Sequence, residues 1–268
     1  MKKMINMPIT VLLFLFSTIP IVIIFFITIT VIKNTKNPPY KFFNSSVSKI
    51  TFLLGVRLRF FGEINNSKCF VMINHTSPID YLLCVLVAGI QPWTVVAGEN
   101  LIKNKKTLED KIVAWLLGYI IRDYSITIDR DDDKSGTEVI KRMKEEIQKK
   151  KIVVFPEGGR TKKDDLKNGT LLRNFHKANS TFKFAWKEGI SIQPVVLDWP
   201  VIWRGKNNKS WGVHPCRINI YCFPIIEPDK YGSAEDYRDA CWKIMSDKLK
   251  ESKNVKRFLM KNSKKGSA

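Results

Sequence analysis

The sequence predicts an α/β fold, a mixed sheet covered by helices, with a membrane-embedded helical segment at its N-terminal end. Three observations support this fold class. Short runs rich in β-branched and aromatic residues alternate with helical stretches. The length of 268 residues suits one sizeable α/β domain with a short attachment. The beginning of the chain is a long apolar run without charge.

The apolar run predicts a membrane anchor over residues 1–36. Residues 4–32 carry no charge, and the almost wholly apolar part, 7–32, exceeds the roughly 20 residues that span a bilayer. A cleaved signal peptide is the alternative, and it fits less well because its apolar region is only about 7–15 residues long. Pro20 interrupts the run, which leaves a single span and a re-entrant hairpin as alternatives. More basic residues follow the run than precede it, so we expect the remaining chain on the cytoplasmic face.

After a break at Asn37-Pro38-Pro39, residues 47–61 show apolar positions at helical spacing. Lys49, Arg57 and Arg59 are the only charges there. We therefore predict an interfacial amphipathic helix within 37–62, with its arginines directed toward lipid phosphates. A core helix of the following domain is the alternative.

Residues 63–251 are predicted to form the main α/β domain, and 252–268 a basic tail attracted to the same membrane. A helix is expected over 137–150, where Val139, Ile140, Met143 and Ile147 form one apolar stripe. The expected strands are 69–73, 93–97, 125–128, 152–155, 192–197 and 217–223.

The composition restricts the class of partner and the compartment. Lys and Arg number 45 against 25 Asp and Glu, and a net charge of +20 predicts an anionic partner. The five cysteines form no Cys-x-x-Cys pair, which argues against a disulfide framework and favours a reducing compartment. No cluster has the spacing of metal ligands, so no metal site is predicted.

The first polar motif follows residues 69–73 and reads Asn-His-Thr-Ser-Pro-Ile-Asp, from Asn74 to Asp80. The Asp80 carboxylate, one turn into the next helix, can reach an imidazole nitrogen of His75 and stabilise the imidazolium. Such a pair can activate the hydroxyl of a substrate without a Ser or Cys nucleophile. The alternative for Asp80 is a simple helix cap, because Ser77 and Pro78 also suit a helix start.

Two further expected strands are followed by arginines. Arg130 comes after 125–128, and 152–155 leads into Pro-Glu-Gly-Gly-Arg-Thr, in which Glu157 precedes Gly158, Gly159 and Arg160. Two arginines at one sheet edge predict recognition of phosphate or carboxylate, and the glycines allow close approach of the backbone to an anion. A local salt bridge of Arg130 with Asp131–Asp133 and a surface position for Glu157 are the alternatives.

The order of these motifs, followed by Gln193-Pro194-Val195, resembles the glycerolipid acyltransferases. Among these, the chain is most similar to 1-acyl-sn-glycerol-3-phosphate (lysophosphatidic acid) acyltransferases. It departs from their pattern at Tyr124, Thr127 and Gly159, where a glycine, an aromatic residue and a threonine are usual. The departures bear on which acceptor is used.

The resemblance implies a glycerol-3-phosphate acyltransferase-like fold and roles for particular residues. His75 would be the general base and Asp80 its orienting partner, while Arg130 and Arg160 would bind the acceptor phosphate. Glu157 and Gly158 would shape the site, and amides near Gly158 and Gly159 are inferred to stabilise an oxyanion. The implied substrates are lysophosphatidic acid and an acyl-CoA or acyl-carrier-protein thioester, with no metal or prosthetic group.

Three other function classes compete with an acyltransferase. A nucleic-acid-binding protein would explain the charge, but no such motif is present and the anchor argues against it. A membrane lipid-binding scaffold would explain the anchor but not the pairing of His75 with Asp80. A hydrolase would use water in place of the acceptor hydroxyl.

Overall fold

A computed structural model describes residues 40–53, 55–76, 80–88, 92–98, 125–128, 135–159, 161, 165–166, 168–173, 175, 179–199, 216–256 and 260. The predicted anchor over 1–36 and most of the tail lie outside these residues. None of the helices in the described ranges is both long and apolar enough to cross a bilayer.

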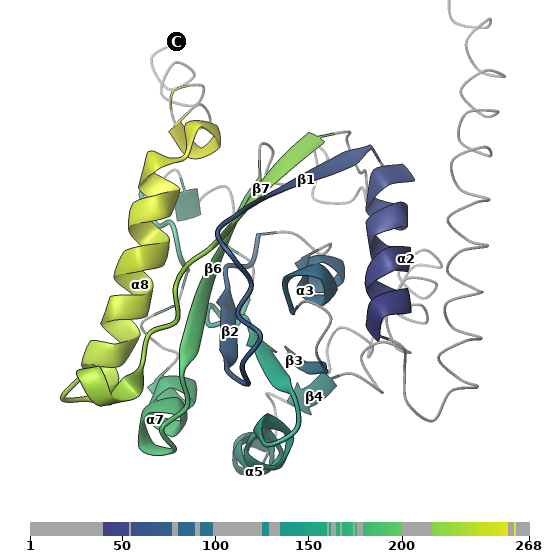
Figure 1. Ribbon diagram of the computed structural model, residues 1–268. Coiled ribbons are helices and arrows are strands. Elements are labelled where there is room, and N and C mark those ends of the chain that lie inside the picture. Colours follow the sequence, from purple (N-terminus) through teal and green to yellow (C-terminus); the bar gives the residue numbers. More distant parts are fainter. Residues whose placement is uncertain are drawn as a thin grey trace, which may run out of the picture.

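Within the described ranges, seven strands form one mixed sheet in the order β1-β7-β6-β2-β5-β3-β4 (Figure 1). Neighbouring strands are parallel except β6 and β7, which are antiparallel. The strands are β1 (Val56–Phe61), β2 (Phe70–Ile73), β3 (Trp93–Gly98), β4 (Ser125–Ile128), β5 (Lys151–Val154), β6 (Ile192–Asp198) and β7 (Cys216–Cys222). The expected mixed sheet is confirmed. Strands β2 to β7 begin and end within one residue of the six expected strands, whereas β1 was not expected.

Helices cover both faces of this sheet (Figure 1). On one face lie α2 and α3, and on the other lie α5, α7 and α8. The helices are α2 (Tyr40–Leu53), α3 (Asp80–Ala88), α5 (Ser135–Ile147), α7 (Asn179–Lys187) and α8 (Ala234–Glu251), with a short 3-10 helix η3 (Pro228–Lys230) before α8.

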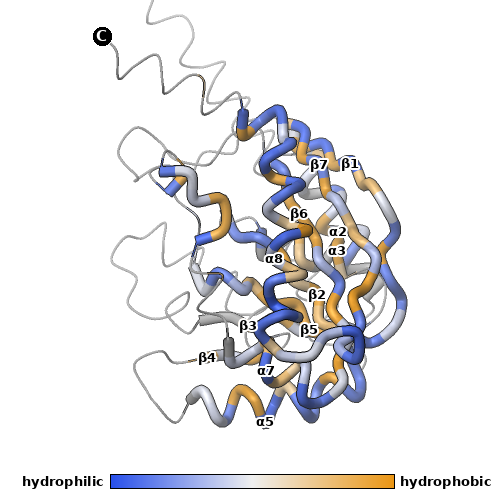
Figure 2. Tube along the Cα trace, turned by 90° about the vertical axis from the view of Figure 1, so that its left-hand side faces the viewer, coloured by the Kyte–Doolittle hydropathy of each residue, from blue (hydrophilic) through white to orange (hydrophobic). Residues whose placement is uncertain are grey.

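The alternation of side chains along β2 shows how the sheet supplies both cores. Val71 and Ile73 pack in a cluster with Leu83 of α3. Phe70 and Met72 pack in a second cluster with residues of α5, α7 and α8. Because successive strand residues point to opposite faces, a strand buried on both sides is apolar throughout. Figure 2 shows the hydrophobic central strands and the alternating hydropathy of α8 on the outside.

The helix predicted over 47–61 is wrong in its second half. The helix α2 ends at Leu53, and Val56–Phe61 forms β1, an edge strand paired with β7. Arg57 and Arg59 therefore lie on a strand, and Arg59 packs over the Phe61 ring at 4.7 Å. The first half is helical, and the burial of Val47 fits the alternative of a helix packed on the domain.

Candidate active site

Two of the motif-bearing strands are neighbours in the sheet. The strands β2 and β5 are parallel, with Met72 opposite Val154. Their carboxyl ends therefore meet at one edge, where His75 and Glu157 follow. The strand β4 ends at the same edge, because β5, β3 and β4 are mutually parallel. Arg130 and Arg160 lie outside the described residues, so their convergence stays a prediction.

His75 and Asp80 form a buried pair. The Nδ1 atom of His75 lies 2.9 Å from Oδ2 of Asp80, whose side chain is fully buried, whereas the imidazole retains 9% exposure. The same carboxylate oxygen accepts the backbone N–H of Thr76 at 2.7 Å. Because this oxygen already accepts a backbone N–H, it can also accept Nδ1–H of the imidazole. In that tautomer Nε2 is the acceptor nitrogen of the ring. Asp80 therefore serves in both of the expected ways: it fixes the loop before α3, as a helix cap does, and it contacts the imidazole of His75.

The His75 ring is also fixed from one side by an aromatic contact. The ring of Phe155, the residue after β5, lies with its centroid 4.4 Å from the imidazole centroid at an interplanar angle of 33°. Phe155 is buried. Packing against Phe155 and the contact with Asp80 together restrict rotation of the imidazole.

Glu157 is buried rather than on a surface loop, and its carboxylate binds backbone on both sides of the site. Its Oε1 accepts the backbone N–H of His75 at 2.7 Å. Its Oε2 accepts the N–H of Arg173 at 3.0 Å and contacts the Thr161 hydroxyl. The Thr161 N–H in turn donates to the His75 carbonyl at 2.7 Å. Glu157 therefore holds the backbone of His75 in place, and burial raises its pKa to about 8.

The two glycines after Glu157 differ in their surroundings. Gly158 has a φ of +60°, in the region that favours glycine, and its N–H donates to the Phe155 carbonyl at 3.0 Å. That amide is thus engaged in the turn, which argues against its expected role at an oxyanion. A Cβ placed on Gly159 would meet no atom within 4 Å, so open space adjoins Gly159.

Sequence reasoning missed two buried residues beside this pair. Trp199, just after β6, donates its Nε1–H to Oδ1 of Asp80 at 2.9 Å. The side chain of Asn74 accepts the N–H of Leu197 at 2.7 Å and donates to its carbonyl at 3.1 Å. A polar residue directly after a buried strand was a visible signal for Asn74. Nothing local pointed to Trp199, which is 119 residues from Asp80.

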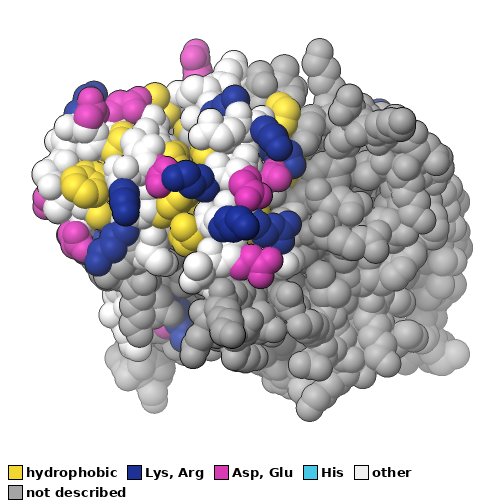
Figure 3. Space-filling view, turned by 90° about the horizontal axis from the view of Figure 1, so that it is seen from below, with side chains coloured by type: hydrophobic (Ala, Val, Ile, Leu, Met, Phe, Trp, Pro, Cys, Tyr) yellow, Lys and Arg dark blue, Asp and Glu magenta, His cyan; other side chains and the backbone are white. Residues whose placement is uncertain are grey.

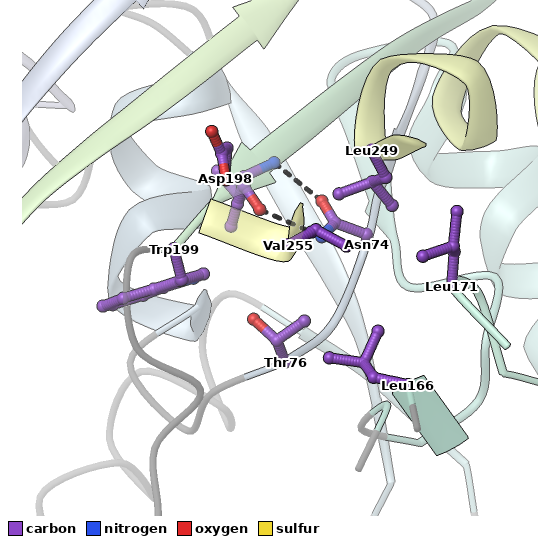
Figure 4. Close-up of a pocket in the computed structure, with 9 residues that line it drawn as sticks. Asn74, Thr76, Leu166, Leu171, Asp198, Trp199, Leu249 and Val255 are labelled. Atoms are coloured by element: carbon purple, nitrogen blue, oxygen red, sulfur yellow. Dashed lines mark hydrogen bonds between the residues drawn. The ribbon is translucent and has the colours of Figure 1, made fainter. Parts of the chain in front are cut away.

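A small pocket adjoins the pair (Figure 4). Thr76 and Trp199 lie on one side, and Leu171 and Leu249 lie on the other. The cavity volume is about 20 Å³, against roughly 300–1,000 Å³ for typical ligand sites. It is too small to hold a lipid substrate in this conformation. Within the described ranges, no group of three or more His, Cys, Asp or Glu side chains is arranged so that it could hold a metal ion.

Comparison with known proteins gives the class that this fold and site define. A family model described as acyltransferase matches residues 57–198, more than half of the chain. The chain belongs to the acyltransferase family, which confirms the resemblance found in its motifs.

The fold is similar to that of a particular solved structure, the 1-acyl-sn-glycerophosphate (LPA) acyltransferase PlsC from Thermotoga maritima. The TM-score is 0.61 at 19% sequence identity, covering 94% of this chain and 99% of that chain. At this identity the likeness is one of fold. No curated protein sequence matches the chain.

Proposed function

We propose that this acyltransferase moves an acyl chain from a thioester, acyl-CoA or acyl-carrier protein, to the sn-2 hydroxyl of lysophosphatidic acid. The product is phosphatidic acid, a precursor in phospholipid biosynthesis. The observation that carries the proposal is the 2.9 Å contact of His75 with the buried Asp80 at the carboxyl end of β2. Family membership and the motif order support the same reaction class.

The pair supplies general base and acid chemistry. With Nδ1–H donated to Asp80, Nε2 of His75 takes the proton of the acceptor hydroxyl as its oxygen attacks the thioester carbonyl carbon. A new C–O bond forms, and the tetrahedral intermediate then collapses with breakage of the C–S bond. The imidazolium returns its proton to the leaving thiolate. Asp80 stabilises the imidazolium between these two transfers.

The acceptor phosphate is assigned to Arg130 and Arg160. A guanidinium binds phosphate oxygens through paired hydrogen bonds, which suits recognition of a phosphomonoester. Open space beside Gly159 supports access of a headgroup to the backbone that leads to Arg160.

We further propose that the protein is membrane-bound through residues 1–36, with its catalytic domain on the cytoplasmic face. Both substrates are anionic amphiphiles, and one of them resides in the bilayer. A positively charged protein held at an anionic membrane surface meets such substrates at a higher local concentration.

Acyl transfer by membranes carrying the protein tests this function. Labelled acyl-CoA, and separately acyl-carrier protein, would be offered with lysophosphatidic acid, glycerol-3-phosphate or lysophosphatidylcholine. We expect product from lysophosphatidic acid, and release of free fatty acid without acceptor only at background level. Transfer only to glycerol-3-phosphate or to lysophosphatidylcholine would reassign the acceptor, and no transfer from either donor would favour the scaffold.

The arginine assignment has its own test in the same assay. Arg130→Ala and Arg160→Ala should raise KM for lysophosphatidic acid by about ten-fold or more, the effect expected for loss of a charged hydrogen bond. KM for the acyl donor serves as the internal control and should change little. Equal use of acceptors with and without a phosphate would contradict the assignment.

A further inference from the structure

The Asp80 carboxylate receives donors on both of its oxygens. While His75 and Thr76 contact Oδ2, the indole N–H of Trp199 points at Oδ1 from 2.9 Å. An indole has a single donor and no acceptor, so this bond uses all of its hydrogen-bonding capacity. Trp199 and Asp80 are both buried, which strengthens a hydrogen bond to a charged group.

The backbone that carries Trp199 is held through two side chains, Asn74 and Asp198. Asn74, the residue before His75, bonds both backbone groups of Leu197 and so continues the β2–β6 pairing past the end of β2. Asp198, next in the chain, accepts the hydroxyl of Ser252 at 2.6 Å beyond the end of α8. Trp199 therefore follows a backbone fixed to the His75 loop on one side and to α8 on the other.

From these contacts we propose that Trp199 is a positioning residue for the acyl-transfer site. Rotation about the Cβ–Cγ bond of an aspartate is soft, and the indole donor on Oδ1 holds the carboxylate plane so that Oδ2 stays against Nδ1 of His75. The proposal rests on the proposed function, because it acts through the base. It names a third member of the His75–Asp80 unit, supplied by the residue after β6.

A packing role alone is the competing explanation, because the indole also lines the pocket in Figure 4. The two roles depend on different properties of the Trp199 side chain. Packing depends on the volume of the ring, whereas positioning depends on the N–H. A change that keeps an aromatic ring but removes the N–H separates them.

Trp199→Phe is the first variant, with Trp186→Phe as its matched control. Trp186, on α7, also donates its indole N–H, to the Tyr231 carbonyl at 3.1 Å, but it lies away from the site. We expect Trp199→Phe to lower kcat about ten-fold, as for a lost hydrogen bond to a charged group, with KM for both substrates within about two-fold. Trp186→Phe should retain the kcat of the wild type.

Two further measurements keep the proposal open to refutation. If Trp199→Phe does not fold, benzothienylalanine at position 199 keeps the bicyclic shape without the N–H and should give the same loss of kcat. In detergent, the ¹⁵N-indole signal that disappears in Trp199→Phe should move upfield in proton shift in Asp80→Ala. An unmoved signal would show that the indole does not bond the carboxylate.

The outcomes also separate this proposal from the function on which it rests. If the wild type is active and the variant without the indole N–H has the same kcat, the role of Trp199 is overturned but the proposed function is not. A wild-type protein that transfers to no acceptor overturns the proposed function, and the positioning role of Trp199 with it. In that case a moved indole signal would still report the contact with Asp80.

Discussion

Glu157 ties the His75 backbone to the loop after β5, and its burial gives a pH-dependent prediction. Its pKa is about 8 in the folded chain against an ordinary value of 4.5, because desolvation disfavours the charged form. Between these values the folded state binds more protons than the unfolded state. The contribution of Glu157 to the free energy of unfolding therefore falls as pH rises from about 4.5 to about 8.

Glu157→Gln removes this ionisation. The unfolding temperatures of the variant and the wild type would be compared at pH 5 and at pH 9. We expect the difference to shift in favour of the variant as pH rises. Glu235→Gln, on the exposed surface of α8, is the control and should follow the wild type. Parallel curves for Glu157→Gln and the wild type would show that the buried carboxylate does not titrate in this range.

Sequence reasoning found the residues whose partners are near in the chain. His75 and Asp80 are five residues apart, so helix geometry alone predicted that they could meet. The bond of Asp80 to Trp199 joins residues 119 apart, and it depends on β6 lying beside β2 in the sheet. Glu157 was expected near the substrate, yet its described contacts are to backbone and to Thr161, because pairing of β5 with β2 aims it at the His75 amide.

At the scale of elements, the close approach of β1 to β7 yields a stability prediction. Gly62 follows β1 with a φ of +78°, and a Cβ there would overlap the Cys222 carbonyl oxygen. Gly169 has the same φ, but a Cβ there would meet nothing within 4 Å. Both alanine variants share the cost of the left-handed conformation, and only Gly62→Ala adds the clash.

Gly62→Ala should lower the free energy of unfolding by about 2 kcal/mol more than Gly169→Ala, the usual scale of overpacking. Denaturant unfolding of the two variants measures the difference. Equal values for the two variants would mean that β1 moves away from β7 without cost.

The elements that sequence reasoning placed correctly are the ones whose composition differs from their flanks. β2 and β6 are buried apolar runs that end in polar motifs, so their limits were visible. The run over residues 47–61 is apolar through both a helix and a strand, and the turn at Gly55 between them has a φ of +71°. In β1, Arg57 and Arg59 alternate with apolar residues, and this period of two fits a strand. Over so short a stretch the same positions also fit a helical pattern, so the sequence did not separate the two.

At the scale of the whole molecule, the charge lies mainly at the two ends of the chain. Residues 1–62 contribute eight of the net twenty positive charges and residues 252–268 contribute six, without one acidic residue in either. In the described part of the face in Figure 3, basic and acidic side chains are interspersed. This distribution favours the terminal segments, rather than that face, for the proposed approach to an anionic membrane.

The proposed membrane attachment predicts how the protein is extracted. Salt at about 1 M reduces the Debye length to roughly 3 Å and weakens attraction to anionic lipid, but it does not weaken burial of an apolar segment. We expect the protein to stay in the membrane pellet after washes with 1 M salt and with alkaline carbonate. Release by salt alone would show that attachment is electrostatic and that residues 7–32 are not embedded.

The central claim is that the His75–Asp80 pair performs base catalysis of acyl transfer, and one comparison tests it most directly. Membranes carrying the wild type, His75→Ala, Asp80→Ala or Asp247→Asn would be given labelled acyl thioester and lysophosphatidic acid. Asp247 is an exposed aspartate on α8 that pairs with Lys243, and it serves as the control. The account predicts phosphatidic acid from the wild type and from Asp247→Asn, with a loss of about 10²–10⁴-fold in both site variants. Undiminished transfer by a folded His75→Ala protein would contradict it.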